Sequence, residues 1–121
     1  MVPESPSVFR EVRNLVNKLS GRKPIIVHCS AGVGRSGTYI AIEMAYQKLK
    51  KAENMDVLSV AKHIREQRLG AVQTDLQYLF IFRMLIELLI ADRAVEKSAE
   101  IRQFLVAYDE LINRKKANKK V

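Results

Sequence analysis

The 121-residue sequence is poor in several residue types, and each shortage excludes a class of protein. Its single cysteine, Cys29, excludes an internal disulfide framework of the kind that holds small secreted domains together. Its two histidines, His28 and His63, lack the partner spacing of a zinc site, and we expect no metal and no cofactor. We expect His63, on a helix among basic residues, to lie on the surface. Tryptophan is absent, and no aromatic residues alternate with basic ones to form a base-stacking platform.

Long apolar runs are missing as well. The first residues are polar and contain proline, unlike a secretory signal. The longest apolar stretch, residues 78–91, carries Arg83 and Glu87 and is shorter than the roughly 20 residues of a membrane span. Since a reactive thiol also needs reducing surroundings, we expect a cytoplasmic protein with no membrane span.

The net charge of +8, with a sequence pI near 9.8, raises the question of a nucleic-acid partner. Lys48, Lys50 and Lys51 fall at the end of a predicted helix, where cations complement the helix dipole. A second cluster of cations forms a basic tail at about residues 113–121, which we expect to fray. A solvated surface explains this pattern, so we expect no nucleic-acid partner. Positive potential near a binding site would still attract acidic peptides.

Hydrophobic periodicity predicts about five helices. The first is predicted to begin at Ser5-Pro6 and end at Ser20-Gly21 with one buried face, and the third to begin near Asp56 and end at Leu69-Gly70. The apolar positions that define the helices are, in order, Val8, Phe9, Val12, Leu15, Val16 and Leu19; Ile40, Ala41, Met44, Ala45 and Leu49; Val57, Val60, Ala61 and Ile64; the stretch from about Asp75 to Ala91; and Ile101, Phe104, Leu105, Tyr108, Leu111 and Ile112.

Residues 25–27, Ile-Ile-Val, are apolar without alternation, which is typical of a strand covered on both faces in a parallel or mixed sheet. No neighbouring strand is evident in the sequence. Each unpaired buried backbone group costs about 1–3 kcal/mol, against a net domain stability of about 5–15 kcal/mol. Three possibilities therefore stay open: a loosely folded chain, strands supplied by a partner chain or by self-association, and a truncated product.

Residues 28–38 carry the strongest chemical signal. They place Cys29 and Arg35, with five residues between them, in a glycine-rich turn that follows an apolar segment, and His28 lies beside the thiol, where we expect it to tune Cys29 by hydrogen bonding. Backbone N–H groups in such a loop form a nest for anions, and a helix beginning directly after it points its positive dipole end to the same place. This environment favours a bound phosphate and favours the thiolate of Cys29 over the thiol. One such feature is common in structural turns, but their combination predicts a phosphate-handling site.

The residue types in this turn fit phosphoryl transfer. Gly32 and Gly34 permit tight curvature and close approach of backbone amides to oxygens. Arg35 offers a planar fork of donors for two phosphoryl oxygens. The hydroxyl of Ser36 is expected to donate toward Cys29 when the thiolate is the leaving group. A loose phosphoryl-transfer transition state needs positioning and charge stabilisation, and transient phosphorylation of a cysteine is covalent catalysis.

Residues 27–38, Val-His-Cys-Ser-Ala-Gly-Val-Gly-Arg-Ser-Gly-Thr, resemble the full signature of the phosphotyrosine-specific protein tyrosine phosphatases. Dual-specificity and lipid phosphatases share only the Cys-x5-Arg core. Residues 72–78, Val-Gln-Thr-Asp-Leu-Gln-Tyr, are similar to the family's glutamine loop. The resemblance implies that Gln73 orients the water that hydrolyses the phosphocysteine, with Gln77 beside it in the pocket. The residues implied to hold the substrate phosphate are Ser30, Ala31, Gly32, Val33, Gly34 and Arg35.

Residues 2–6, Val-Pro-Glu-Ser-Pro, are similar to the tail of the family's mobile Trp-Pro-Asp loop. Met1 stands where the family usually has a glycine, so the aspartate that protonates the leaving tyrosine would precede residue 1. The preceding strands and the substrate-recognition loop would precede it too. The resemblance thus implies an α/β fold in which residues 1–121 form the C-terminal part of a protein tyrosine phosphatase domain, mostly helical with one central strand.

Three functions stay open from the sequence. The first is a protein-tyrosine phosphatase of signal transduction, in which Cys29 attacks phosphorus, Arg35 grips the phosphoryl oxygens and Gln73 guides the water. Loss of one general acid typically lowers the rate about 10²–10⁴-fold, so activity would be weak. The second is a module that binds phosphotyrosine-containing proteins or peptides without turnover. The third is a fragment with no independent fold.

Overall fold

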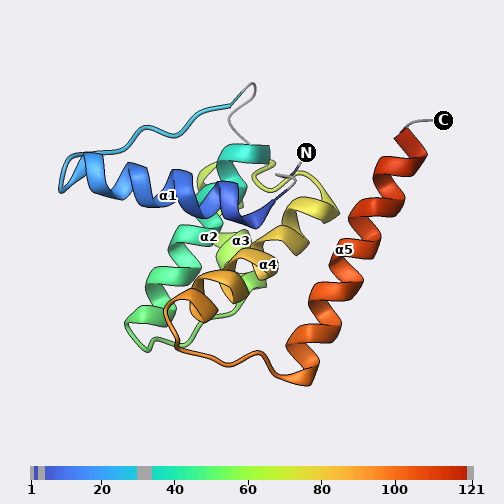
Figure 1. The fold of residues 1–121 in the computed structure, drawn as a ribbon. Coiled ribbons are helices and arrows are strands. Elements are labelled where there is room, and N and C mark those ends of the chain that lie inside the picture. The colour runs from blue at the N-terminus through green and yellow to red at the C-terminus, as the bar shows by residue number, and fades with distance from the viewer. Residues whose placement is uncertain (1, 3–4, 30–33, 120–121) are drawn as a thin grey trace. The chain divides into compact units, whose positions relative to one another are not determined.

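The computed structural model describes residues 2, 5–29 and 34–119, and this part of the chain consists of helices joined by irregular segments (Figure 1). The helices are α1 (Pro6–Ser20), α2 (Gly34–Lys50), α3 (Val57–Gln67), α4 (Asp75–Ala91) and α5 (Ala99–Lys119). The chain divides into two compact units, Met1–Leu88 and Leu89–Val121. The first holds α1 to α3 and most of α4, and the second holds α5.

Side-chain caps place the helix starts where the sequence predicts them. Ser5 caps α1, because its Oγ accepts a hydrogen bond from the Ser7 backbone N–H at 3.3 Å. Asp56 caps α3 by accepting from the Leu58 and Ser59 N–H groups and from the Ser59 hydroxyl. The Ser59 hydroxyl lowers the pKa of Asp56 below its ordinary value, with smaller contributions from the two backbone N–H groups. The bounds of α4 are those predicted, and α3 ends at Gln67, two residues before Leu69.

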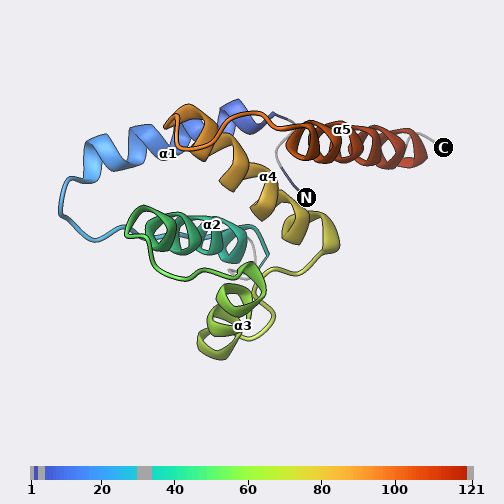
Figure 2. The same ribbon diagram turned by 90° about the horizontal axis from the view of Figure 1, so that it is seen from below.

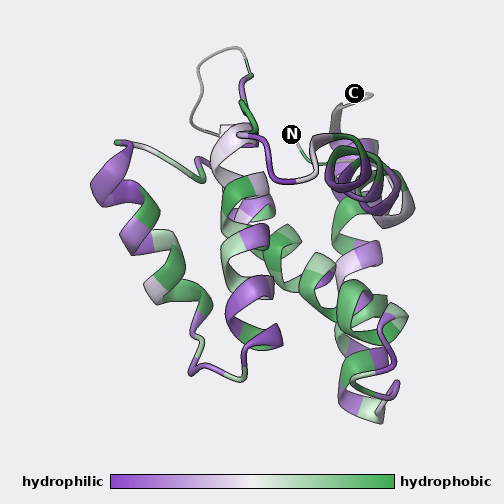
Figure 3. Cartoon of the chain, turned by 90° about the vertical axis from the view of Figure 1, so that its left-hand side faces the viewer, coloured by the Kyte–Doolittle hydropathy of each residue, from purple (hydrophilic) through white to green (hydrophobic). Residues whose placement is uncertain are grey.

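An aromatic cluster joins three helices of the first unit. The ring of Phe9 on α1 lies 5.3 Å from that of Tyr39 on α2 and 5.7 Å from that of Phe80 on α4, the second pair edge to face. Helices α2 and α3 pack side by side (Figure 2), and hydrophobic and hydrophilic stretches alternate along the helices (Figure 3). The predicted buried positions of α3, Val57, Val60, Ala61 and Ile64, are confirmed.

The buried face of α2 agrees with the predicted one only in part, because Ala41 and Ala45 are buried as predicted and Met44 and Leu49 are half-buried. Ile40 is exposed, whereas Ile42 and Tyr46 are buried. The buried stripe begins with Gly34 and Gly37 and continues at helical spacing through Ala41 and Ala45. The two glycines belong to this face because they let other backbone approach closely, and a pattern of apolar side chains does not include them.

The strand predicted at residues 25–27 is wrong in this structure, and the described residues contain no strand. Residues 24–29 are irregular, with Ile25 48% and Ile26 89% exposed. A strand needs a neighbour that takes its N–H and C=O groups, and no described segment supplies one. The described fold is therefore all-helical, not α/β.

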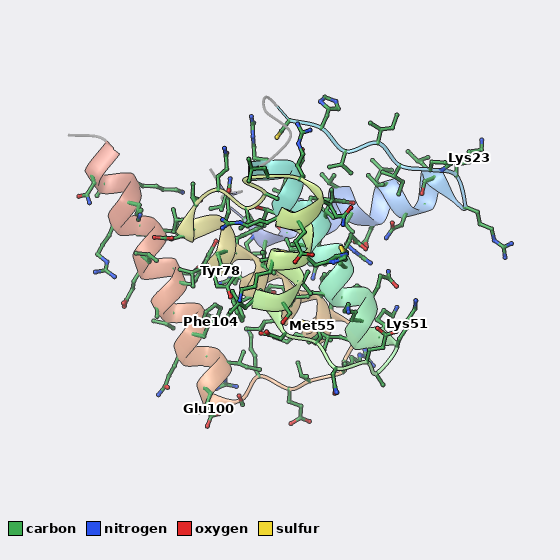
Figure 4. All side chains as sticks on the ribbon, turned by 180° about the vertical axis from the view of Figure 1, so that it is seen from behind. Lys23, Lys51, Met55, Tyr78, Glu100 and Phe104 are labelled. Carbon is green, nitrogen blue, oxygen red and sulfur yellow. The ribbon has the colours of Figure 1, made fainter. Side chains whose placement is uncertain are left out.

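The apolar face of α1 is also more exposed than predicted. Of its six predicted positions only Phe9 is buried, while Val8, Val12, Leu15 and Leu19 are 50–73% exposed. A salt bridge contributes to the attachment of this helix, because the buried Arg13 pairs with Glu43 of α2 and its guanidinium carbon lies 4.6 Å from the centre of the Tyr46 ring. Lys23 lies in the segment that follows α1 (Figure 4). The same segment contains the exposed side chains of Ile25 and Ile26.

The second unit contains α5, whose predicted stripe is present. Leu105 and Tyr108 are buried, and Ile101, Phe104, Leu111 and Ile112 are half-buried. The helix continues to Lys119, so the tail that we expected to fray from residue 113 is helical over its described part. Among the helices of residues 5–29 and 34–119, none combines the length and the hydropathy that crossing a bilayer requires.

Candidate active site

Cys29 is the last described residue before the predicted phosphate loop. It is half-buried and, as the chain's single cysteine, forms no internal disulfide, and His28 beside it is exposed. Four of the residues predicted to hold phosphate, Ser30, Ala31, Gly32 and Val33, lie outside the described residues. Their role stays a prediction.

Helix α2 begins at Gly34, directly after that loop, as predicted. The first N–H groups of a helix have no intrahelical acceptor, and the helix dipole is positive at this end. Arg35 lies in this first turn and is exposed, whereas Gly34 is buried. The Thr38 hydroxyl donates to the Gly34 carbonyl oxygen at 2.7 Å and closes the turn. Along the chain, Cys29 thus precedes residues 30–33 and Arg35 follows them, in the first turn of α2.

Ser36 is 4% exposed, and its Oγ has no hydrogen-bond partner among the described residues. A buried hydroxyl without a partner costs about 1–3 kcal/mol, which is unusual outside functional sites. Donation from Ser36 to Cys29 stays a prediction. The hydroxyl has no competing partner in the described part of the chain.

The glutamine loop is held by the second glutamine. Gln77, 3% exposed, accepts hydrogen bonds through Oε1 from the backbone N–H groups of Gln73 at 2.9 Å and Thr74 at 3.2 Å. The Thr74 hydroxyl in turn accepts from the Gln77 N–H at 3.1 Å. Gln73 itself is exposed. The side chain of Gln77 therefore holds the backbone of the loop through hydrogen bonds, while the side chain of Gln73 is exposed to solvent.

This loop meets the start of α2 at two glycines. A Cβ on Gly34 would collide with Gln73 Oε1 and lie 3.0 Å from Gln77 Nε2. A Cβ on Gly37 would lie 2.9 Å from both the Ala71 Cβ and the Val72 backbone nitrogen. The structure thus brings Gln73 and Gln77 against the first residue after the phosphate loop, although about 40 residues of sequence separate them.

Sequence reasoning missed one residue of this arrangement, Arg65 on α3. Its Nε donates to the Ala71 carbonyl oxygen at 2.8 Å and its Nη2 to the Val72 carbonyl oxygen at 2.6 Å. Val72 is buried and has a φ of +60°, a conformation that β-branched residues rarely adopt. No spacing rule connects an arginine on a helix with two carbonyl groups in a later loop.

Comparison with known proteins places this segment in a family. The family model described as "Protein-tyrosine phosphatase" matches residues 1–87, which include the Cys29 segment and the glutamine loop. The chain belongs to the protein-tyrosine phosphatase family. The resemblance seen in the sequence is confirmed, and the match covers nearly the whole first unit but not α5.

Curated members of the protein-tyrosine phosphatase family match the same part of the chain. Rattus norvegicus receptor-type tyrosine-protein phosphatase C is 42% identical over 88 residues, 71% of this chain and 7% of that protein. Mus musculus receptor-type tyrosine-protein phosphatase N2 is 45% identical over 89 residues, 71% of this chain and 9% of that protein. Mus musculus tyrosine-protein phosphatase non-receptor type 20 is 34% identical over 87 residues, 72% of this chain and 20% of that protein. The matched segment is therefore a small share of each relative's length.

Proposed function

We propose that the chain hydrolyses phosphotyrosine in proteins or peptides through a phosphocysteine on Cys29. The observation that carries this proposal is the contact between the glutamine loop and Gly34. That contact supports a site in which Gln73, the residue proposed to orient the hydrolytic water, lies beside the loop proposed to hold phosphate.

In the first step the Cys29 thiolate attacks the phosphorus atom. An S–P bond forms, the P–O bond to the phenol breaks, and the phenol oxygen leaves with the electron pair and takes a proton from solvent water. Arg35 grips two equatorial oxygens through its planar fork, and the N-terminus of α2 stabilises their negative charge. Loop amides at residues 30–34 supply the rest of the anion nest.

In the second step a water oxygen attacks the same phosphorus atom. The S–P bond breaks, the electron pair returns to the sulfur as thiolate, and inorganic phosphate and a proton are released. Gln73 orients this water through its side-chain amide, Gln77 maintains the loop that presents it, and the Ser36 hydroxyl donates to the departing thiolate. His28 tunes Cys29 from the neighbouring position.

The substrate and the setting follow from the same chemistry. A phosphotyrosine-containing protein or peptide fits an anion nest on a chain of net charge +8, because acidic flanking residues are attracted to it. A cytoplasmic setting suits a nucleophilic thiol, which an oxidising compartment would consume.

Substrates with different leaving groups test the proposal. The purified chain is expected to hydrolyse 4-nitrophenyl phosphate, whose acidic phenol leaves without protonation, and to act much more slowly on a phosphotyrosine peptide. Cys29→Ser should abolish both activities, and His63→Ala, on an exposed position of α3, serves as the matched control. Binding of the peptide without Cys29-dependent turnover of either substrate would reject the enzyme in favour of a binding module.

Vanadate tests whether the site is folded. A ligand that binds only the native state raises the melting temperature by mass action. We expect a cooperative melt that shifts upward with vanadate in the wild-type chain and less in Arg35→Ala. A chain without any cooperative melt would be a fragment with no independent fold.

A further inference from the structure

Arg65 makes a two-point polar contact with the segment that leads into Gln73, and the sequence does not predict it. It reaches from α3 and donates two hydrogen bonds to consecutive carbonyl oxygens, those of Ala71 and Val72, at 2.8 and 2.6 Å. Gln73 is the next residue. A planar guanidinium makes two such bonds with one fixed orientation, which a single-point donor does not.

The backbone of Val72 shows why this clamp, the pair of hydrogen bonds from Arg65 to residues 71 and 72, is needed. Its φ of +60° is a left-handed conformation, which is unfavourable for a β-branched side chain unless the surroundings hold it. The Val72 side chain is 2% exposed, and its backbone nitrogen lies against Gly37 of α2. The segment is therefore held both by its packing against α2 and by the hydrogen bonds of Arg65.

The direction of the chain at Val72 determines where Gln73 points. Gln73 Oε1 lies in the space that a side chain on Gly34 would fill, so a small rotation at Val72 moves the amide away from the phosphate loop. We propose that Arg65 is a positioning residue for the second chemical step: it holds the backbone at 71 and 72 so that Gln73 orients the water that hydrolyses the phosphocysteine. This inference rests on the proposed function.

The two steps of the reaction separate this role from general support of the fold. Attack of Cys29 on the substrate does not involve Gln73, so the rate of S–P bond formation should not depend on Arg65. Breakage of the S–P bond by water should slow by about 10–100-fold when Gln73 is misplaced. The variant should therefore accumulate phosphocysteine.

Burst kinetics with 4-nitrophenyl phosphate measure both steps. In Arg65→Met we expect an unchanged burst of 4-nitrophenol per mole of chain, followed by a steady-state rate about 10–100-fold lower. Arg65→Lys should fall between, because lysine satisfies one carbonyl at a time. Lys62→Met, one turn earlier on α3, is the matched control and should behave as wild type.

A double variant tests the connection between the two side chains. If Arg65 acts through Gln73, then Arg65→Met combined with Gln73→Ala should be no slower than Gln73→Ala alone. Fully multiplicative losses would overturn the inference. So would a burst that falls in Arg65→Met in proportion to the steady-state rate, because that result means loss of folded chain.

Hydrogen exchange supplies a readout that does not need turnover. In Arg65→Met the backbone amides of Gln73 and Thr74, which donate to Gln77, should exchange faster, while amides within α2 and α3 keep their protection. Unchanged exchange at these two amides would refute the clamp. Absence of a Cys29-dependent burst in the wild-type chain would refute the proposed function, and the exchange result would still decide whether Arg65 holds the loop.

Discussion

Gly37 lies where α2 meets the segment before the glutamine loop, and one added methyl group tests that contact. A Cβ there would lie 2.9 Å from the Ala71 Cβ and from the Val72 backbone nitrogen. Neither atom is the flexible end of a side chain, so the backbone must move. Overpacking of this kind costs about 1–3 kcal/mol.

Helix propensity opposes that loss. Gly37 is inside α2, where alanine in place of glycine stabilises a helix by about 0.5–1 kcal/mol. We therefore expect Gly37→Ala to lower the free energy of unfolding by about 0–2.5 kcal/mol. Urea denaturation followed by circular dichroism measures this change.

Gly34→Ala is the matched comparison. Its Cβ would collide with Gln73 Oε1, the far end of an exposed side chain that can move away, and would lie 3.0 Å from Nε2 of the buried Gln77, which a shift of a few tenths of an ångström relieves. Stability should change by less than about 0.5 kcal/mol, while the steady-state hydrolysis of 4-nitrophenyl phosphate should fall because Gln73 is displaced.

A Gly37→Ala variant more stable than the wild type would show that residues 71–72 do not lie against α2 and would refute the reasoning.

Three further perturbations follow from the packing. Arg13→Met should lower the free energy of unfolding by about 1–3 kcal/mol in a urea titration, because Glu43 keeps a half-buried charge without its partner; no loss would mean that the salt bridge is not formed. Phe9→Ala should cost about 3–5 kcal/mol, whereas Leu19→Lys on the same helix should stay within about 0.5 kcal/mol, since Leu19 is 73% exposed; equal losses would show that the exposed stripe is covered in solution. The pKa of Asp56 is lowered by folding, so its charge contributes stability above its ordinary pKa and loses it as the pH falls through the lower folded value; the stability gap between wild type and Asp56→Ala should therefore close only in acid, and a gap independent of pH would contradict the cap.

The helix boundaries were predictable because they depend on local chemistry. Ser5 and Asp56 accept hydrogen bonds from N–H groups two or three residues later, and such caps can be predicted from the residue type at the start of a helix. The predicted burial of α3 is right for the same reason, since its apolar positions recur at helical spacing.

The failures concern contacts between distant segments. The strand at residues 25–27 has the composition of a strand, but hydrogen-bonded partners, not composition, make one. The rotation of α2 depends on the close approach of residues 71–72 to Gly37, and the hydrogen bonds of Arg65 depend on where α3 lies. None of these has a local pattern.

The candidate site was predicted unequally. Residues 28–38 and physical chemistry alone predict a loop that is followed by an arginine at the N-terminus of a helix. Helix α2 does begin at Gly34. The pairing of that turn with Gln73 and Gln77 came only through the family resemblance, because about 40 residues separate the two stretches. The structure adds the physical reason, namely that Gly34 leaves room for both glutamine side chains.

The central claim is that the Cys29 sulfur accepts a phosphoryl group, and an acid-quenched reaction tests it most directly. The chain is mixed with 4-nitrophenyl phosphate, stopped with acid within the burst, and measured by intact-mass and peptide mass spectrometry. We predict one added phosphoryl group, located on Cys29, with a larger trapped fraction in Gln73→Ala and none in Cys29→Ser. Turnover with no phosphoryl group on Cys29 in either the wild type or Gln73→Ala would contradict the account.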